Sequence, residues 1–245
     1  MKFTGIIPAR YASTRLEGKP LADICGHPMI EWVVRRARQS ELDDVLVATD
    51  DERILMAVQA FGGKALMTRS DHPNGTSRLA EVCESLTDCD VAVNIQGDEP
   101  LIEPEMINQL IRAFREDPGL VMATLKHRLD TPEEIRNPNA VKVVTDKNGF
   151  ALYFSRSPIP YPRKETAAVY YKHIGIYAYK RDFVLEYARM PVTSLESSES
   201  LEQLRVLENG YKIKVEETSH RIIGVDTMEE LERVRKWITQ NKIQR

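Results

Sequence analysis

Three basic side chains, Arg10, Arg15 and Lys19, lie in one short loop that follows the first apolar stretch of the chain. Two prolines and a glycine in and around this loop restrict the path of its backbone. Cations and free backbone amides at the carboxyl end of a first strand form an anion-binding site. Three cations favour a polyphosphate as the anion, although a solvated basic loop would have the same composition.

Two acidic side chains are candidate metal ligands. Asp98 lies in the turn after the fourth apolar stretch, and Asp226 precedes the last amphipathic stretch. A carboxylate at the carboxyl edge of a sheet, opposite a cationic loop, is a natural ligand for Mg²⁺ on nucleotide phosphates. Each acid also has a structural interpretation, because Asp98 can form the turn and Asp226 with Glu229 fits a helix capping box. Thr227 with Glu230 can supply that cap instead, which would leave Asp226 available as a ligand.

A turn at Asn74-Gly75 begins a third candidate region. We expect Thr76 or Ser77 to cap a helix over 78–86. Gly75 and Thr76 would then bring backbone amides and carbonyls to the carboxyl edge of the sheet. Such groups can read the hydrogen-bonding edge of a flat heterocycle, but a plain capped turn would have the same local sequence.

The elements that must position these residues alternate regularly. Apolar stretches over 3–7, 45–49, 64–68 and 90–95 predict strands, and amphipathic stretches over 29–39, 52–61 and 78–86 predict helices between them. Capping of the second helix explains Asp50 and Asp51 better than a ligand contact does. The alternation predicts a doubly wound, mostly parallel α/β sheet. Neither a P-loop nor a G-x-G-x-x-G fingerprint is present, which disfavours P-loop NTPases, ordinary kinases and dinucleotide dehydrogenases.

The second half of the chain has a different pattern. Strands are expected over 120–126, 141–145 and 150–155, with a hairpin turn at 147–149 between the last two. We therefore expect a single domain over 1–245 that includes a β-rich subdomain over 125–180, which binds a second substrate, dimerises, or both.

Two further groups of residues could hold a polar substrate. Alternation over 172–179 places His173, Gly175, Tyr177 and Tyr179 on one face of a strand, which could equally be an interface or a wet sheet face. In a helix predicted within 194–208, Glu202 and Gln203 could meet sugar hydroxyls, though exposed helix-surface residues would look the same.

The composition sets limits on the class of protein. The chain has 245 residues, 42% of them hydrophobic and 29% charged, as in an ordinary soluble globular protein. A net charge of −3 argues against a general nucleic-acid binder. We expect no membrane span and no signal peptide. Three cysteines fit neither a disulfide framework nor a zinc site, which favours a reducing cytoplasm.

The ordered motifs together resemble a known family. They are Ile7-Pro-Ala-Arg-Tyr-Ala-Ser-Thr-Arg-Leu-Glu-Gly-Lys-Pro-Leu21, Val47-Ala-Thr-Asp50, Met67-Thr-Arg69, Asn74-Gly-Thr-Ser-Arg78, Asn94-Ile-Gln-Gly-Asp-Glu-Pro100, Asn139-Ala-Val-Lys-Val-Val144, Ala151-Leu-Tyr-Phe-Ser-Arg-Ser-Pro-Ile-Pro160, Lys172-His-Ile-Gly-Ile-Tyr177, Ser200-Leu-Glu-Gln-Leu-Arg205 and Gly224-Val-Asp-Thr227. The chain resembles the sugar nucleotidyltransferases, and most closely the 3-deoxy-manno-octulosonate (Kdo) cytidylyltransferases. The similarity spans nearly the whole chain in the expected order. Glu17 stands where the family usually has proline, and Asn74 stands where it usually has a serine-like residue.

The resemblance implies an activity and its requirements. CTP and Kdo would give CMP-Kdo and pyrophosphate with Mg²⁺, in a cytoplasmic homodimer that supplies Kdo for lipopolysaccharide or capsule. The 8-amino analogue of Kdo or another acidic sugar is the alternative substrate.

The resemblance also implies roles for particular residues. Asp98 and Asp226 resemble the Mg²⁺ ligands, and with Arg10 and Lys19 they form the predicted catalytic set. The predicted nucleotide site comprises Pro8, Ala9, Arg10, Arg15, Lys19, Arg69, Gly75, Thr76, Gln96 and Asp98. The predicted Kdo site comprises Gln96, Arg156, His173, Tyr177, Glu202 and Gln203.

Overall fold

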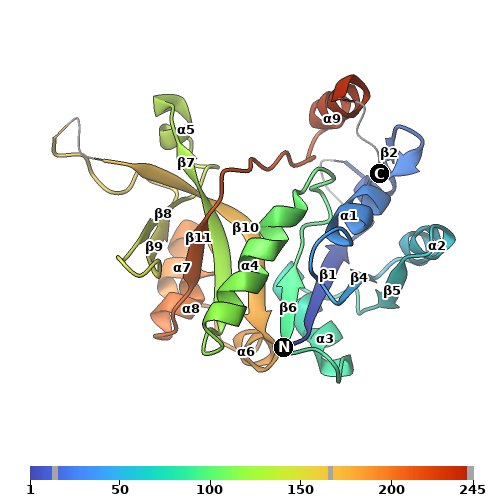
Figure 1. The fold of residues 1–245 in the computed structure, drawn as a ribbon, viewed down its shortest axis with the longest axis horizontal. Coiled ribbons are helices and arrows are strands. Elements are labelled where there is room, and N and C mark those ends of the chain that lie inside the picture. The colour runs from blue at the N-terminus through green and yellow to red at the C-terminus, as the bar shows by residue number, and fades with distance from the viewer. Residues whose placement is uncertain (13–15, 165–167, 242–245) are drawn as a thin grey trace.

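A nine-stranded mixed sheet forms the centre of the computed structural model, which describes residues 1–12, 16–164 and 168–241 (Figure 1). Seven strands follow one another across it, in the order β11 (Lys214–Glu217), β7 (Met122–Leu129), β10 (Tyr170–Lys180), β6 (Val91–Asn94), β1 (Phe3–Ala9), β4 (Asp44–Thr49) and β5 (Lys64–Met67). The hairpin of β8 (Lys142–Thr145) and β9 (Ala151–Ser155) branches from β10. A separate ribbon pairs β2 (Asp23–Ile24) with β3 (His27–Pro28).

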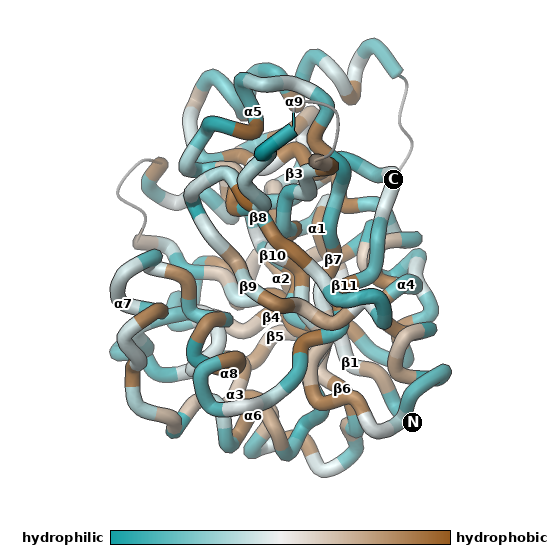
Figure 2. Tube along the Cα trace, turned by 90° about the vertical axis from the view of Figure 1, so that its left-hand side faces the viewer, coloured by the Kyte–Doolittle hydropathy of each residue, from teal (hydrophilic) through white to brown (hydrophobic). Residues whose placement is uncertain are grey.

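The amino-terminal half of the sheet is parallel, as the sequence predicts. β1 pairs in parallel with both β4 and β6, and β4 pairs in parallel with β5. Side chains alternate between the two faces of β1, so that Phe3 and Ile7 join one apolar core while Ile6 joins the other. Burial on both faces explains why β1, β4 and β6 are nearly continuous apolar runs. In Figure 2 the central strands are coloured as more hydrophobic than the segments that surround them.

Helices cover both faces of the sheet. Residues of α1 (Met29–Ala37), α2 (Glu52–Ala60) and α4 (Pro104–Glu116) enter the first core. Residues of α3 (Gly75–Ser85), α6 (Arg181–Tyr187) and α8 (Leu204–Glu208) enter the second. The remaining helical elements are η1 (Lys19–Leu21), α5 (Pro132–Arg136), α7 (Ser194–Glu199) and α9 (Met228–Asn241). This layered arrangement confirms the predicted α/β class.

Two helices differ from their predicted bounds. α3 begins at Gly75, ahead of the predicted 78–86, because Asn74 is the capping residue and its side chain accepts a hydrogen bond from the Ser77 amide at 2.9 Å. The helix predicted within 194–208 divides into α7 and α8, because Ser200 adopts a left-handed conformation with φ 51°. The intervening turn carries Glu202 and Gln203.

The strands of the β-rich segment 125–180 continue the main sheet. β10 pairs antiparallel with β6 on one side and with β7 on the other, so most of the segment shares the central hydrogen-bonded ladder. The hairpin β8–β9 extends from this ladder and is joined by the predicted turn. The assignment of this segment to sugar binding and dimerisation stays a prediction.

The last helix returns to the amino-terminal half. After β11 the chain runs to α9, which lies beside the β2–β3 ribbon (Figure 1). Leu231, Val234 and Ile238 of α9 pack with Trp32 in a third apolar cluster. None of the described helices has the length and apolar character needed to cross a membrane.

Candidate active site

A cleft of about 370 Å³ lies at the carboxyl ends of β1 and β6. Its lining residues are Pro8, Ala9, Arg10, Ala12, Lys19, Pro20, Gln96, Gly97, Asp98 and Asp226. Open α/β sheets bind ligands at this edge, next to the strand where the order of the connections reverses. The cleft therefore brings together the first loop, the turn after β6 and the residue before α9, which are far apart in the sequence.

Lys19 lies between the two predicted metal ligands. Its Nζ donates to Oδ2 of Asp98 at 2.7 Å and to Oδ1 of Asp226 at 3.1 Å. Burial alone would lower the pKa of Lys19, but the charges and hydrogen bonds of Asp98 and Asp226 outweigh it, and the pKa is raised. The ammonium thus stays charged, and it holds the two carboxylates close to a common point.

Two backbone features bring Asp98 to this point. A Cβ placed on Gly97 would lie 2.8 Å from the carbonyl oxygen of Pro8, so the turn after β6 can approach β1 this closely only with glycine. The Val225 amide then donates to the carbonyl of Asp98 at 2.9 Å. This bond ties the segment before α9 to the turn, and Asp226 is the next residue.

The carboxylate of Asp226 is not needed to cap α9. Glu230 accepts hydrogen bonds from the amides of Asp226 at 2.8 Å and Thr227 at 3.1 Å, while the Glu230 amide donates to the Thr227 hydroxyl at 3.3 Å. Thr227 and Glu230 therefore form the reciprocal capping arrangement in place of Asp226 and Glu229. The substitute cap foreseen in the sequence leaves the Asp226 side chain directed to Lys19.

The carboxylates of Asp98 and Asp226 suit a divalent cation whose other ligands are phosphate oxygens and waters. Among the described residues there is no group of three or more His, Cys, Asp and Glu side chains that could enclose a metal ion. Mg²⁺, however, is usually held by one or two carboxylates together with waters and substrate phosphates. Asp98 and Asp226 supply two carboxylates around one cationic atom, so the residues present fit this kind of site.

The first loop is held in place by contacts outside the cleft. The Gly18 amide donates to the carbonyl of Tyr11 at 3.0 Å, and the guanidinium carbon of Arg53 lies 3.3 Å from the centre of the Tyr11 ring. The pKa of Arg53 is raised, chiefly by its hydrogen bond with Asp51 and to a smaller extent by the charges of Tyr11 and Glu17. Glu17, the acid that departs from the family pattern, is therefore placed to act on Arg53. Arg15 lies outside the described residues.

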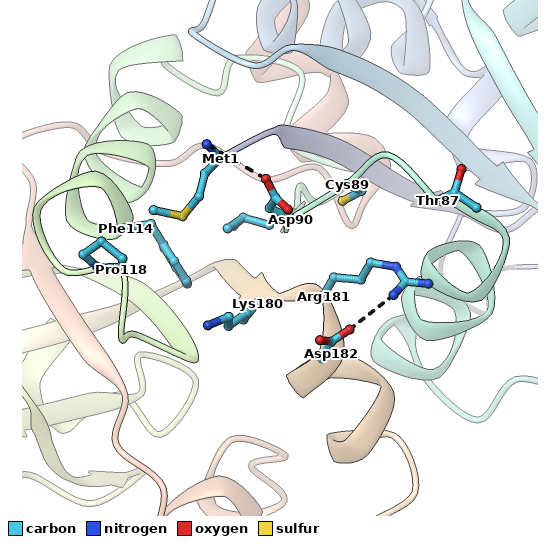
Figure 3. A pocket seen from close by; sticks show the side chains of 10 residues that line it. Met1, Thr87, Cys89, Asp90, Phe114, Pro118, Lys180, Arg181 and Asp182 are labelled. Atoms are coloured by element: carbon cyan, nitrogen blue, oxygen red, sulfur yellow. Dashed lines mark hydrogen bonds and ion pairs between the residues drawn. The ribbon is translucent and has the colours of Figure 1, made fainter.

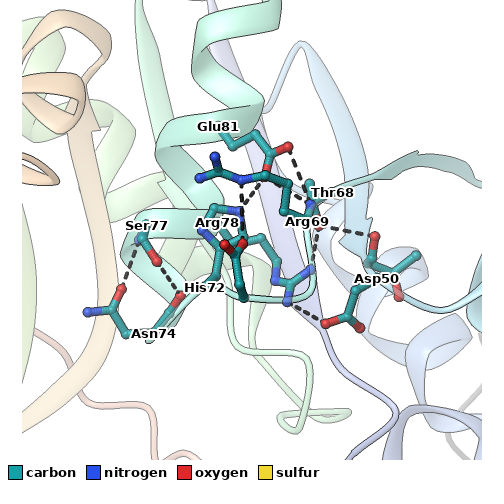
Figure 4. A network of polar contacts seen from close by, with 10 residues as sticks. Asp50, Thr68, Arg69, His72, Asn74, Ser77, Arg78 and Glu81 are labelled. Atoms are coloured by element: carbon teal, nitrogen blue, oxygen red, sulfur yellow. Dashed lines mark hydrogen bonds and ion pairs between the residues drawn. The ribbon is translucent and has the colours of Figure 1, made fainter.

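The amino terminus of α3 faces the first strand. A Cβ built on Gly75 would lie 3.8 Å from Cγ of Pro8, which lines the cleft, so Gly75 lies beside the cleft, and the nucleotide-binding role of Gly75 and Thr76 stays a prediction. Arg69 is different: its side chain is 70% exposed, lies 3.5 Å from Asp71 and does not line the cleft. Its backbone amide is bound by Glu81, which also contacts His72 (Figure 4).

Sequence reasoning missed a buried arginine beside this turn. Arg78 is fully buried, and its guanidinium donates to Asp50 at 2.6 Å and to the hydroxyl of Thr68 (Figure 4). Its Nε has no hydrogen-bond partner. Asp50 follows β4 and Thr68 follows β5, so Arg78 joins the ends of two strands to α3. The sequence predicts that Asp50 and Asp51 cap α2. Asp51 is the cap, whereas Asp50 instead accepts a hydrogen bond from Arg78. An arginine four residues after an Asn-Gly turn was the available signal.

Arg156 fastens backbone segments around the predicted sugar site. Its guanidinium donates to the carbonyls of Glu199 at 2.6 Å, Pro138 at 3.1 Å and Ser200 at 3.2 Å. Glu199 also accepts from the Arg156 amide at 2.9 Å. Arg156 therefore supports the turn that carries Glu202 and Gln203, in addition to any contact with a ligand.

His173 is a buried, neutral side chain. Its Nε2 lies 3.0 Å from the hydroxyl of Thr124, and that hydroxyl also contacts the carbonyls of Ile174 and Ile176 at 3.0 and 2.8 Å. Burial, with a smaller effect from Lys172, lowers the pKa of His173 to about 3. The expected shared face is present, since the rings of His173 and Tyr177 lie 5.3 Å apart. His173 therefore supports the irregular part of β10 and is not charged near neutral pH.

Of the predicted sugar-binding residues, Glu202 and Gln203 lie on the turn between α7 and α8 and Arg156 contacts it, outside the lining of the cleft, while His173 and Tyr177 lie on β10. Burial raises the pKa of Tyr177, and the charge of Glu202 adds to this effect. Gln203 is 5% exposed. Gln96 connects the two regions, because it lines the cleft and its Nε2 donates to the carbonyl of Gly175 at 2.9 Å. The position of Gln96 between the two substrates stays a prediction.

A second cavity, of about 450 Å³, lies at the opposite edge of the sheet (Figure 3). It is lined by Met1, Asp90, Lys180, Arg181 and Asp182, among others. The Arg181 guanidinium already donates to the carbonyls of Cys83 and Leu86 at 3.0 and 2.9 Å. Because the cavity faces the amino ends of β1 and β6, it does not contribute to the candidate site.

The fold and the cleft define the class of protein as a nucleotidyltransferase. The family model described as "Cytidylyltransferase" matches residues 4–214. A solved 4-diphosphocytidyl-2C-methyl-D-erythritol synthase from Anaerococcus prevotii has the same fold, with a TM-score of 0.63 at 13% identity over 97% of this chain and 96% of that one.

Closer relatives identify the family. The chain is 67% identical over 243 residues to a 3-deoxy-manno-octulosonate cytidylyltransferase of Fusobacterium nucleatum, covering 99% of each chain. It is 56% identical over 246 residues to one of Geotalea uraniireducens, covering 96% of this chain and 98% of that one. A solved CMP:2-keto-3-deoxy-manno-octonic acid synthetase complexed with CTP superimposes with a TM-score of 0.95 at 49% identity, over 98% of this chain and 100% of that one. The chain belongs to the 3-deoxy-manno-octulosonate cytidylyltransferase family, as its motifs predict.

Proposed function

We propose that this protein transfers the cytidylyl group of CTP to Kdo, giving CMP-Kdo and pyrophosphate in a magnesium-dependent reaction. The observation that carries the proposal is the cluster of Lys19, Asp98 and Asp226 at the carboxyl edge of the sheet, in a chain of this family. The cluster combines a cation for phosphate oxygens with two carboxylates for a metal ion.

The reaction requires positioning and charge neutralisation more than a covalent nucleophile. The anomeric hydroxyl of Kdo attacks the α-phosphorus in line while pyrophosphate leaves, so one P–O bond forms as another breaks. Lys19 and Arg10, which both line the cleft, offset the charge that develops on the leaving group. Asp98 and Asp226 would hold the metal ion, which when bound would neutralise phosphate charge and make the attacking hydroxyl more acidic.

The deprotonation does not require a histidine. His173 is buried, neutral and hydrogen-bonded to Thr124, and no histidine is among the residues that line the cleft within the described chain. The hydroxyl proton would pass to solvent, and a metal ion held by Asp98 and Asp226 would make that proton more acidic.

The sugar is proposed to bind beside the nucleotide, between Gln96 and the turn after α7. Arg156 holds that turn, and Glu202 and Gln203 lie on it. Kdo is an anion, and Arg156 retains N–H groups beyond the three that its backbone contacts use. We assign the carboxylate of the sugar to Arg156 or to the metal ion.

We further propose that the protein acts as a homodimer in the cytoplasm. An apolar groove of about 690 Å³ is lined by Pro132, Ile135, Pro158, Tyr161 and Tyr170 among others, and the Tyr161 side chain is 86% exposed. An apolar groove of this kind on the β-rich segment suits contact with a second copy. Light scattering should give twice the monomer mass, and Tyr161→Glu should shift the protein toward monomer. A monomeric wild-type protein would refute the dimer.

The substrate assignment is tested by pyrophosphate release. Purified protein is incubated with CTP, Mg²⁺ and, in parallel, Kdo, its 8-amino analogue or a sialic acid. We expect release with Kdo to be faster than with the other sugars. Preference for the 8-amino analogue would favour the alternative substrate, and no release with Kdo would refute the proposal.

A further inference from the structure

The side-chain amide of Asn74 makes two contacts at once. Its Oδ1 accepts a hydrogen bond from the Ser77 amide at 2.9 Å and so caps α3. Its Nδ2 donates to Oε1 of Glu202 at 3.1 Å, although Glu202 is 128 residues further along the chain. One side chain therefore joins the start of α3 to the turn between α7 and α8.

Glu202 is held from several sides. The carbonyl of Glu202 accepts from the Tyr187 hydroxyl at 2.8 Å, which fixes the backbone of the turn. Burial raises the pKa of the Glu202 carboxyl, while a hydrogen bond from Thr76 and the charge of Arg205 act in the opposite direction. Asn74 and Thr76, two donors to the carboxylate, thus both belong to the amino terminus of α3.

The same terminus lies against the cleft. Gly75 separates Asn74 from Thr76 and faces Pro8, one of the residues that line the cleft. A ligand bound beside Pro8 would contact Gly75, which is covalently joined to Asn74, and Asn74 is hydrogen-bonded to Glu202.

We propose that Asn74 is a positioning residue that fixes Glu202 for the sugar and couples it to the nucleotide-binding end of α3. This inference rests on the proposed function, in which Glu202 contacts Kdo. In this proposal the bound nucleotide restricts the motion of the amino terminus of α3. The hydrogen bond from Asn74 then restricts the Glu202 carboxylate as well.

Serine at this position would not do both tasks. A serine hydroxyl can accept from the Ser77 amide and cap α3. Its single short oxygen cannot also donate across the gap that the longer asparagine amide spans to Glu202. The substitution Asn74→Ser therefore separates the contact to Glu202 from the cap.

The first test compares wild type, Asn74→Ser and Asn74→Ala in steady-state kinetics with CTP and Kdo. A hydrogen bond to a charged group changes an equilibrium by roughly tenfold. We expect Asn74→Ser to raise KM for Kdo by about that factor, with KM for CTP and the Tm close to wild type. Asn74→Ala should also lower the Tm, because it removes the cap.

A double-mutant cycle shows whether Asn74 acts through Glu202. We expect Asn74→Ser to lower kcat/KM for Kdo in the wild-type background but not in the Glu202→Ala background. An unchanged KM for Kdo in Asn74→Ser would overturn the proposal. An equal loss in both backgrounds, or a matching loss of CTP affinity, would also overturn it, because Asn74 would then act only on the fold of α3.

Hydrogen exchange separates this inference from the proposed function, because it needs CTP alone. We expect CTP to slow amide exchange over residues 199–205 in wild type and not in Asn74→Ser. The same slowing in both proteins would contradict the coupling, even if Kdo were not the substrate. Absence of pyrophosphate release by wild type with Kdo would instead refute the proposed function.

Discussion

The ammonium of Lys19 lies 2.7 Å from the carboxylate of Asp98, a residue 79 positions further along the chain. It also lies 3.1 Å from Asp226, which precedes the last helix. The Lys19 side chain is 16% exposed, so these charges interact in a partly desolvated cleft. Lys19 therefore occupies the point between the two carboxylates that the proposed reaction needs for a metal ion. Lys19 and the metal ion should compete for these carboxylates, and binding of the triphosphate should give the ammonium new partners.

Replacement of Lys19 by methionine should affect both catalysis and metal binding. Loss of the ammonium should lower kcat/KM by about a hundredfold or more, because a charge-stabilising group in a cleft is removed. Mg²⁺ without nucleotide should raise the Tm of Lys19→Met more than that of wild type, since the carboxylates no longer have a competing cation. Differential scanning fluorimetry and initial rates measure these effects. Lys2→Met, which removes an exposed lysine, is the control, and wild-type rates in Lys19→Met would contradict the assignment.

Neutralising either predicted metal ligand should abolish turnover with little change in fold. Asp98→Asn and Asp226→Asn should each lower kcat by about a thousandfold, because the site loses a charge that binds the cation. Their circular dichroism spectra should match wild type, since both side chains are partly exposed. Asp71→Asn removes an exposed carboxylate and should keep wild-type activity. If Asp98→Asn retains wild-type kcat at the same Mg²⁺ concentration, Asp98 is not a ligand.

The Asp50–Arg78 pair should contribute strongly to stability. Arg78 is fully buried and the side chain of Asp50 is 15% exposed, so Asp50→Asn leaves a buried cation without its charged partner. We expect the free energy of unfolding in urea to fall by about 3 kcal/mol. Glu84→Gln, in an exposed pair with Arg189, should change it by less than about 1 kcal/mol. Equal effects of the two substitutions would refute the buried role of this pair.

Stability should depend on pH through His173. The pKa of His173 is lowered from 6.5 to about 3 in the folded protein, so the unfolded chain binds more protons between these values. Its contribution to stability is complete above about pH 6.5 and is lost as the pH falls toward 3. Relative to His173→Gln, wild type should lose about 2 kcal/mol of unfolding free energy between pH 7 and pH 5. Parallel urea curves for the two proteins over this range would show that His173 is not buried in a neutral form.

The sequence predicted the shared position of Lys19 and Asp98 because both residues follow strand ends. Lys19 and Asp98 come after β1 and β6, and parallel neighbours place their carboxyl ends at one edge of the sheet. The sequence also predicted that the Asp226 side chain could be available as a ligand, because Thr227 and Glu230 can cap α9 in its place. The structure contains this capping pair. These inferences need only the element order and local capping rules.

Other features depend on packing that a sequence pattern does not contain. The burial of Arg78 requires that β4 and β5 end beside α3, which brings Asp50 and Thr68 to the same guanidinium. His173 lies on the predicted face, but its neutral state follows from its burial, which packing beside Phe154 and Thr124 produces. Arg156 is a residue type that often binds anions, so the sequence suggested a ligand contact. Its hydrogen bonds to backbone carbonyls depend on the tertiary position of the turn after α7, which the sequence pattern does not contain.

The fate of the anomeric oxygen of Kdo tests the proposed reaction most directly. The protein is incubated with CTP, Mg²⁺ and Kdo labelled with oxygen-18 at that position, and the products are followed by phosphorus NMR and mass spectrometry. We predict CMP-Kdo with the label in its phosphodiester linkage and unlabelled pyrophosphate, because the Kdo hydroxyl attacks the α-phosphorus. Label in pyrophosphate, or no CMP-Kdo at all, would contradict the proposed reaction.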